Sequence, residues 1–551
     1  MAPISEILSI GIRYLLYVFL IRCVLVYGYR IFLHPLHNIP GPFVARFSDW
    51  YGAHHAFLRR GHEVTYQNHR KYGSVYRHGP NKLVFNTVQA LHDIYQNDRL
   101  SKSRAYLATK PHPTISNLFN VLDKRLHRTK RRVIGQGIND KAMREFEPLM
   151  LSHIDTFVRS LVKSASSTNL DATEPKVVNM TPAIKSLTLD TITHLAFGSP
   201  LSLQTQPQRH PYFLRGLAIA NYRTNMYIQF PVIKHFDYIE RILYPFMWTS
   251  QKTFYRTLRE MIGQRAMQGK VEGKKDLYEF VRDVKDPETG EGLGMADVWS
   301  EAAFLVPAGG DTTATALAAT LHYLSHSPSA YTRLAREIRT TFTSASDIRL
   351  GPKLASCSYL RAVIDESMRL TPPTPTTLWR EEIPSRIKGE KKEPLVVDGI
   401  VVPPGTEIGV SIYAIHHNAE YFPEPFAFRP ERWLPGETFS DAKGLKKDEA
   451  ERQRKLTLEA FTPFSLGPRG CAGKAMAYSE TSLVLARLLW CLDFERPGAN
   501  KNRDAERESM GKVPEFRVKD QFSALTEGPE LVFRKRGEAW REMFEDEDRA
   551  E

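Results

Sequence analysis

The stretch Phe464-Ser-Leu-Gly-Pro-Arg-Gly-Cys-Ala-Gly473 places one cysteine in a short, glycine-rich loop. Gly467 and Gly473 permit backbone turns that a Cβ atom would obstruct. The segment that follows has the composition and apolar spacing of a buried helix. Cys471 is therefore expected where a loop enters a helix, and there the free N–H groups and the helix dipole would favour an anionic sulfur and lower its pKa. The loop predicts a metal ligand; the alternative is that Cys471 is a small buried apolar residue.

This stretch resembles the cysteine loop of the cytochromes P450, in which a Phe-x-x-Gly-x-Arg-x-Cys-x-Gly pattern carries the thiolate ligand of haem iron. All five fixed positions of the pattern are present. The resemblance implies a haem b cofactor, iron-protoporphyrin IX, with Cys471 as the axial iron ligand. It also implies that Phe464 and Arg469 lie beside the haem.

The whole chain fits one large domain. It has 551 residues, of which 42% are hydrophobic, and no Gly/Ser-rich linker divides it. With the resemblance, this composition predicts a mainly α protein with small β-sheets, the cytochrome P450 fold, behind an N-terminal membrane anchor. The expected organisation is a transmembrane anchor at 1–33, a proline-rich hinge at 34–45, a catalytic domain at 46–540 and an acidic tail at 541–551.

Charge and cysteine usage narrow the function. The formal net charge is +13, but the basic residues are dispersed and no recognition helix or stacking platform accompanies them, which disfavours nucleic acid as a partner. An anionic membrane face or an acidic protein partner explains the charge more economically. The four cysteines have no disulfide-type spacing, which favours a reducing compartment.

The apolar run from Ile7 to Phe32 is long enough to span a bilayer, which takes about 20 residues. Arg13 and Arg22 weaken this prediction, and the alternative is a helix that lies in the membrane interface. Basic residues follow the run while Glu6 precedes it, so the catalytic part should face the cytosol. The expected location is the endoplasmic reticulum membrane, with a single-pass N-terminal anchor.

The densest basic run of the chain is Lys124 to Arg132. His127 and Arg131 are four residues apart and therefore share one face of a helix. The family that this run resembles holds a haem propionate with residues at this spacing, and Arg380 matches a further propionate-binding position. The other basic residues could receive the acidic surface of a redox partner. The partners that the resemblance implies are NADPH-cytochrome P450 reductase, which delivers the electrons of NADPH, and cytochrome b5 as an additional donor.

A predicted apolar helix from Ala296 to about Ser325 contains Pro307-Ala-Gly-Gly-Asp-Thr-Thr313. The proline and the two glycines predict that the helix is bent or opened here. The stretch matches the P450 pattern in which Asp311 and Thr312 guide protons to dioxygen, so these two are the predicted catalytic residues. The alternative for Thr312 is a hydrogen bond back to its own helix.

Glu366 and Arg369 share one face of a predicted helix, and Arg432 follows in Phe428-Arg-Pro-Glu-Arg-Trp433. Together they resemble the structural Glu-Arg-Arg triad of the P450s. Residues 207–234 and 102–122 resemble the roof and the access loop of the substrate pocket. Tyr72 to Phe85 reads as a β-hairpin, and Gly436 to Leu458 as a solvated charged insertion. The candidates for lining the substrate pocket are Pro307, Ala308, Thr374 and Thr376.

These features predict a haem-thiolate monooxygenase that uses dioxygen to oxidise a lipophilic small molecule. Several stretches, such as Pro40-Gly-Pro-Phe43, resemble fungal P450s of secondary metabolism. An enzyme alternative is oxidative coupling or isomerisation without net oxygen insertion. The Asp311-Thr312 pair argues against isomerisation and leaves coupling open. An alternative of another class is a non-catalytic haem-binding membrane protein.

Overall fold

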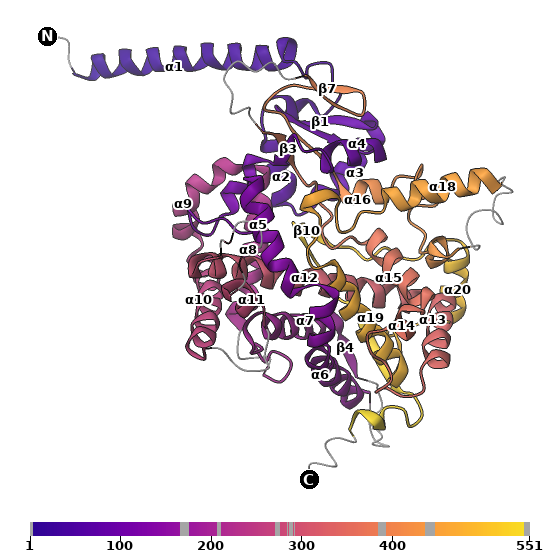
Figure 1. Ribbon diagram of the computed structural model, residues 1–551. Coiled ribbons are helices and arrows are strands. Elements are labelled where there is room, and N and C mark those ends of the chain that lie inside the picture. The colour runs from indigo at the N-terminus through magenta and orange to yellow at the C-terminus, as the bar shows by residue number, and fades with distance from the viewer. Residues whose placement is uncertain are drawn as a thin grey trace.

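The computed structural model describes residues 4–165, 176–206, 211–269, 276–283, 285, 290, 292–383, 393–435 and 447–544. Helices form most of the body, and small sheets lie at its edge (Figure 1). The described helices include α1 (Ile4–Gly28), α2 (Trp50–Phe57), α3 (Gly61–Tyr72), α4 (Val88–Tyr95), α5 (Lys124–Gly137), α6 (Asp140–Ser164), α7 (Met180–Phe197), α8 (Pro211–Gln229), α9 (Asp237–Leu243), α10 (Pro245–Met267), α11 (Leu277–Asp283), α12 (Met295–His326), α13 (Pro328–Thr341), α14 (Pro352–Ala355), α15 (Ser358–Leu370), α16 (Ile412–His416), α18 (Lys447–Ala460), α19 (Lys474–Cys491) and α20 (Lys501–Ser509).

The largest described sheet has five strands in the order β1-β2-β8-β5-β3. The predicted hairpin is confirmed, because β1 and β2 pair antiparallel with Val75 opposite Phe85. The β2 strand also pairs in parallel with β8, which joins the N-terminal part of the chain to the segment before α16. The strands are β1 (Val75–Gly79), β2 (Lys82–Phe85), β3 (Leu100–Lys102), β4 (Val177–Asn179), β5 (Arg380–Glu382), β6 (Leu395–Val397), β7 (Ile400–Val402), β8 (Glu407–Val410), β9 (Leu492–Glu495), β10 (Lys519–Gln521), β11 (Ser523–Leu525) and β12 (Glu530–Lys535).

Helix α12 runs through the middle of the body and packs against α7, α15 and α19. It begins and ends within one residue of the predicted bounds. Of the two predicted forms, a bent or an opened helix, the structure excludes a break at Pro307, because the helix continues without interruption from Met295 to His326. The two glycines serve close packing instead. A Cβ atom on Gly309 would lie 2.8 Å from Ile192, and one on Gly310 would lie 2.5 Å from Leu189, so α7 and α12 approach each other more closely than larger residues permit.

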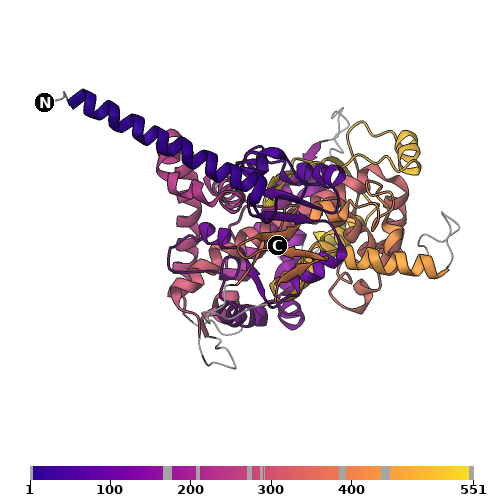
Figure 2. The ribbon, with the colours of Figure 1, turned by 90° about the horizontal axis from the view of Figure 1, so that it is seen from above.

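Helix α1 projects away from the body and packs little against it (Figures 1 and 2). The segment Ser9–Leu33 has a mean hydropathy of 1.9 and none of its best window is buried, so by length and composition it is able to cross a membrane. The proline-rich segment after it is fastened to the sheet. The Pro40 carbonyl accepts from the Arg77 amide at 2.8 Å, and a Cβ on Gly41 would lie 2.5 Å from the Arg77 carbonyl oxygen.

The charged insertion and the segment assigned to the acidic tail are both partly structured. The second half of the charged insertion forms helix α18, which begins at Lys447. The acidic tail does not begin at residue 541, since Arg541–Met543 forms a 3-10 turn and Met543 is buried in the main core. Residues 545–551, which hold most of the predicted tail, lie outside the described residues.

Candidate active site

The loop of residues 464–473, the Cys471 loop, is held by its own backbone. The Cys471 amide donates to the Phe464 carbonyl and the Gly470 amide to the Gly467 carbonyl, each at 2.9 Å. Gly467 has a φ of +69°, and a Cβ atom there would lie 2.0 Å from the Tyr95 carbonyl oxygen, so only glycine fits. Helix α19 begins three residues after the cysteine, as predicted. Gly473, by contrast, has an ordinary backbone conformation, and a Cβ there would meet no protein atom.

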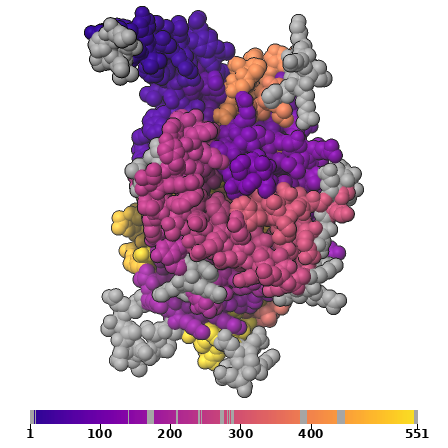
Figure 3. Space-filling view, turned by 90° about the vertical axis from the view of Figure 1, so that its left-hand side faces the viewer, coloured from indigo at the N-terminus to yellow at the C-terminus, as the bar shows by residue number. Residues whose placement is uncertain are grey.

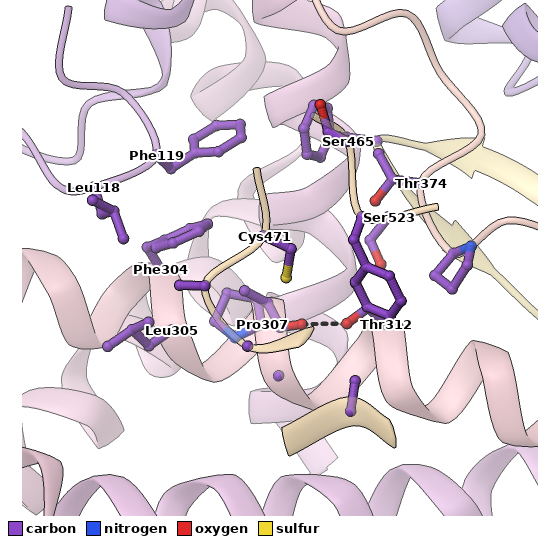
Figure 4. Close-up of a pocket in the computed structure, with 18 of the residues that line it drawn as sticks. Leu118, Phe119, Phe304, Leu305, Pro307, Thr312, Thr374, Ser465, Cys471 and Ser523 are labelled. Carbon is purple, nitrogen blue, oxygen red and sulfur yellow. Dashed lines mark hydrogen bonds between the residues drawn. The ribbon is translucent and has the colours of Figure 1, made fainter. Parts of the chain in front are cut away.

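One cavity of about 330 Å³ lies between the Cys471 loop and α12 (Figure 4). Cys471 and Phe464 line it from the loop, and Pro307, Ala308 and Thr312 line it from the helix. Thr374 lines it as well. Thr376 does not line this cavity; it borders a second, much smaller one among His62, His78 and Asp520. The structure therefore separates Thr376 from the three other pocket candidates, because the chain bends at Thr374 and Thr376 and does not run as a regular strand there.

The Cys471 side chain is exposed to this cavity, yet protein surrounds it on its other sides. Burial raises the pKa of the thiol above its ordinary value, although the Gly473 amide and the charges of Arg131 and Lys474 act in the opposite direction. The predicted net lowering of this pKa is therefore wrong for the protein alone, because desolvation outweighs the helix terminus. A coordinated metal ion deprotonates a thiol outright, so the sulfur still suits a metal ligand.

Five basic side chains gather at one edge of the cavity: Lys102, His127, Arg131, Arg380 and Arg469, here called the cation cluster. All except Arg380 line the cavity, and Arg380 is buried beside it, with its guanidinium 4.7 Å from the centre of the Tyr95 ring. Their charges act on one another. Burial and the charges of Arg469, Lys102, Arg131 and Arg380 lower the pKa of His127 to about 3. Burial, Arg380 and Arg469 lower the pKa of Lys102 well below its ordinary value.

Arg131 and Arg469 also fix the surrounding backbone. Arg131 donates from Nη1 to the Gly470 carbonyl at 2.7 Å and from Nη2 to the Cys471 carbonyl at 3.1 Å. Arg469 donates to the carbonyls of Val121 at 2.6 Å and Leu122 at 3.1 Å. These bonds join the start of α5 to the Cys471 loop, across more than 300 residues of chain.

Asp311 and Thr312 are neighbours in the chain but face different surroundings. Thr312 lines the cavity, and its hydroxyl donates to the Ala308 carbonyl at 2.5 Å, the back-bonded arrangement that was the alternative prediction (Figure 4). Asp311 is buried and does not line the cavity. Its carboxylate accepts from the Asn221 amide of α8 at 2.5 Å and pairs with Lys185 of α7 at 3.1 Å. The acid is thus held between α7, α8 and α12.

The structure brings Glu366, Arg369 and Arg432 together in the core. Arg369 donates twice to the Glu366 carboxylate at 2.9 Å, and Arg432 donates to it at 3.0 Å. The Trp433 indole donates to the same carboxylate at 3.1 Å. Burial raises the pKa of Glu366, but the two arginines outweigh this effect and the net direction is downward. Arg369 also donates to the carbonyls of His416, Pro425 and Ala427. The cluster therefore fixes the segment 416–427, which precedes α18.

Three pocket phenylalanines and two polar residues escaped the sequence analysis. Phe119, Phe304 and Phe522 line the cavity from the access loop, from α12 and from the turn between β10 and β11. Phe522 has a φ of +75°, which is rare for a side chain of this size and marks a constrained turn. Lys102 and Asn221 carried no motif that would have distinguished them. From the predicted roof, α8 contributes Ala220, Asn221 and Thr224 to the lining, whereas its aromatic residues Phe213 and Tyr227 do not line this cavity.

The residues present fit a thiolate-bound haem. Within the described part of the chain, neither Lys102 nor Arg380 has a carboxylate partner, and buried cations of this kind require anions such as the two propionates of haem. Gly473 lines the cavity with open space where a Cβ would project, which leaves room for a flat group next to the sulfur. A thiol, open space beside Gly473 and clustered cations at one edge define a haem-thiolate site.

Comparison with known proteins agrees with this class. The family model for cytochrome P450 matches residues 49–519. The chain is 34% identical over 526 residues to cytochrome P450 monooxygenase apf7 of Gibberella fujikuroi, an alignment that covers 92% of this chain and 95% of that protein. It is 34% identical over 513 residues to atnE of Emericella nidulans and 35% identical over 513 residues to AKT7 of Alternaria alternata, covering 92% of this chain and 93% and 94% of those two cytochrome P450 monooxygenases. The chain belongs to the cytochrome P450 family and is a P450 monooxygenase, for which the family implies a haem b cofactor.

Proposed function

We propose that this monooxygenase oxidises a lipophilic small molecule of fungal secondary metabolism, using electrons that a separate reductase takes from NADPH. The single observation that carries the proposal is that the Cys471 thiol and the Thr312 hydroxyl line one mainly apolar cavity. The apolar wall supports a lipophilic substrate, and the thiol opposite the hydroxyl supports oxygen chemistry between the two.

In this proposal Cys471 would supply the thiolate that holds haem iron, with Phe464 beside it. His127, Arg131, Arg380 and Arg469 hold the propionates. When bound, haem would supply the activation of dioxygen, and the Cys471 thiolate would donate electron density to it. The remaining work belongs to the side chains. They orient the substrate, exclude bulk water and supply protons at the correct place.

Thr312 and Asp311 supply those protons. The Thr312 hydroxyl exchanges its bond to the Ala308 carbonyl for a bond to a group in the cavity, so that Oγ1 presents a proton there. Asp311 passes a proton to Thr312 when its carboxylate leaves Lys185 or Asn221, because in its paired position the carboxylate does not line the cavity. Pro307, Ala308 and Thr374, which line the cavity, would contact the substrate.

The electron donors dock at α5. Arg125 and Arg128 are exposed there, on the helix whose Arg131 binds the Cys471 loop, so an acidic surface of NADPH-cytochrome P450 reductase or cytochrome b5 would lie close to the haem edge. Charge reversal at Lys124 and Arg128 is expected to slow reduction of the haem without altering haem content.

The anchor places the enzyme in the endoplasmic reticulum membrane, with the catalytic domain in the cytosol. Large apolar side chains are exposed along α1, and others are exposed near the hinge and on the segment before and within α9, namely Phe43, Trp50, Val232, Phe236 and Ile242. In Figure 3, the helices that follow α7 cover this face of the body below the N-terminal part. An apolar rim near the anchor would let lipophilic substrates enter directly from the bilayer.

The decisive experiment expresses the full chain with a fungal reductase and records the reduced, carbon-monoxide-bound spectrum. A thiolate-type Soret band that disappears in Cys471→Ala, together with NADPH-dependent incorporation of ¹⁸O from ¹⁸O₂ into a fed terpenoid, polyketide or alkaloid, supports the proposal. Oxidised product without ¹⁸O would replace oxygen insertion by oxidative coupling. A haem-replete protein that keeps the band in Cys471→Ala would overturn it.

A further inference from the structure

The turn at residues 117–120 of the access loop is locked by two asparagines. The Asn117 amide donates to the Asn120 side-chain oxygen at 2.9 Å, and the Asn120 amide donates to the Asn117 side-chain oxygen at 3.1 Å. The side-chain Nδ2 of Asn117 donates to the Ser300 carbonyl of α12 at 3.2 Å. The turn is therefore compact in itself and already touches α12.

Glu301, one turn of α12 away from Asp297, binds the same turn. Both of its carboxylate oxygens accept from the Leu118 amide, at 2.9 and 3.1 Å. Its side chain is 1% exposed, and an unpaired carboxylate at such a position would be very unfavourable. Lys130 of α5, which is fully buried, donates to Glu301 at 2.8 Å and to Asp297 at 2.8 Å. Lys130 thus balances the charge of Glu301 and links α5 to α12. The bond from the Leu118 amide to Glu301 links the access loop to the same pair.

The residue that this turn presents to the cavity is Phe119. Its ring stacks on Phe304 of α12 at 5.2 Å with 20° between the planes, and it meets Phe522 edge to face at 5.0 Å. The Lys102 ammonium lies 4.2 Å from the centre of the Phe119 ring. All three rings line the cavity, and Figure 4 shows Phe119 and Phe304 together on one side of the pocket. We call Phe119, Phe304 and Phe522 the aromatic wall.

We infer that Glu301, whose charge is balanced by Lys130, is a positioning residue that holds the access loop against α12. By fixing the loop, Glu301 builds the aromatic wall, and this wall selects ligands with a flat unsaturated ring. Glu301 does not line the cavity, so it acts only through the Leu118 amide and the adjoining Phe119. Flat rings fit because offset stacking and edge-to-face contacts are available from three directions. The inference rests on the proposed function in one respect, that the cavity holds haem iron to which a probe can bind.

The test uses two probes that coordinate haem iron, imidazole and 4-phenylimidazole, titrated into the full-length haem protein and followed by the Soret shift. The ratio of their dissociation constants reports how strongly a ligand ring contacts the aromatic wall, because only the phenyl group of 4-phenylimidazole reaches the wall. We expect Glu301→Leu to reduce the preference for 4-phenylimidazole about tenfold and to leave imidazole binding unchanged, since about 1.4 kcal/mol corresponds to a factor of ten. Glu301→Gln keeps an oxygen acceptor for the Leu118 amide and should retain most of the preference. Asp297→Asn is the matched control, because Asp297 binds Lys130 but not the turn.

A double-mutant cycle separates positioning from general destabilisation. Phe119→Ala should lower the preference as much as Glu301→Leu, and the double variant should show no further loss, because both changes remove the same ring. Hydrogen exchange of residues 117–120 should accelerate in Glu301→Leu and stay slow in Asp297→Asn. Additive losses, or an unchanged preference in Glu301→Leu, would overturn the inference. If Glu301→Leu fails to take up haem, Glu301→Leu with Lys130→Met replaces it, because an apolar pair leaves no buried charge.

The two proposals fail separately. A wild-type protein that shows no Soret shift with either probe and no thiolate band contradicts the proposed function. Fast exchange of residues 117–120 in the wild type contradicts the clamp, whether or not the protein binds haem.

Discussion

Arg131 and Cys471 are joined by a hydrogen bond of 3.1 Å, from the guanidinium on α5 to the carbonyl of the proposed iron ligand. A second bond from the same guanidinium reaches Gly470 at 2.7 Å. Arg131 therefore holds the backbone on which the sulfur is mounted, in addition to any contact with a propionate.

The first prediction concerns this arginine. Arg131→Leu removes two charge-assisted hydrogen bonds, each with a net contribution of about 1.5–3 kcal/mol, so the free energy of unfolding should fall by about 3 kcal/mol or more. Haem content per protein should fall with it, measured from the pyridine haemochrome. Arg128→Gln, an exposed position on the same helix, serves as the control and should change neither quantity. Full haem content and stability in Arg131→Leu would show that the Cys471 loop holds itself.

Thr312 gives the second prediction. With the hydroxyl removed in Thr312→Ala, protons reach dioxygen without guidance, so a larger share of the electrons from NADPH should appear as hydrogen peroxide. General acid assistance contributes about a hundredfold or more, and a loss of product of at least about tenfold is expected. Thr312→Ser retains the hydroxyl and should stay near the wild type. Equal peroxide yields in Ala, Ser and wild-type proteins would contradict the role.

The buried triad gives the third prediction. Glu366→Gln leaves Arg369 and Arg432 without their shared carboxylate, at a cost of about 3–5 kcal/mol. Denaturant titration of the haem protein measures this cost. Glu459→Gln on α18 breaks a pair with the exposed Lys455, in which Glu459 itself is partly exposed, and should change stability by less than about 1 kcal/mol. Equal losses of stability in the two variants would show that the triad contributes no more to stability than the Lys455–Glu459 pair.

The fourth prediction concerns Glu480 on α19. Burial raises the pKa of this carboxyl from 4.5 to about 8, against a hydrogen bond from Thr191 that lowers it. The folded state therefore keeps a proton that the unfolded chain releases, so this group makes the wild type less stable as the pH rises from about 4.5 to about 8. Each unit of that range costs up to about 1.4 kcal/mol.

Glu480→Gln lacks this titration. Its stability relative to the wild type should rise steadily between pH 5 and pH 8, measured by thermal unfolding at constant ionic strength. Glu451→Gln, an exposed position on α18, should show a difference that does not depend on pH. A flat difference for Glu480→Gln as well would mean that the carboxyl is ionised throughout.

The sequence predicted those parts of the site that local spacing encodes. Three features were predicted in this way: the Cys471 loop, the helix that carries Asp311 and Thr312, and the Glu366–Arg369 pair. In each of them the functional residues are close together in the chain, so their geometry follows from the turn or from the helical repeat. The sequence alone could not decide the role of Gly309 and Gly310, because a pair of glycines can loosen an isolated helix or allow close contact with a neighbouring helix. The contacts of Gly309 and Gly310 with α7 decide between the two, and those contacts are tertiary.

The aromatic wall was not predictable for a related reason. Phe119, Phe304 and Phe522 come from three segments that meet only in the folded chain, and none of them belongs to a motif. Lys102 is likewise identified by its place among Arg380 and Arg469 rather than by its neighbours in sequence. The sequence predicts the reaction class because the chemistry requires particular residue types at particular spacings. It does not predict substrate selectivity, because selectivity depends on how distant segments pack around the cavity.

The position of Phe522 in the chain has a consequence for biosynthesis. Because synthesis runs from the N-terminal side, α1 leaves the ribosome long before the hairpin of β10 and β11, so the Phe522 side of the pocket is made late. A chain interrupted before β10 would keep the Cys471 loop and α12 but would lack the ring of Phe522 in its cavity.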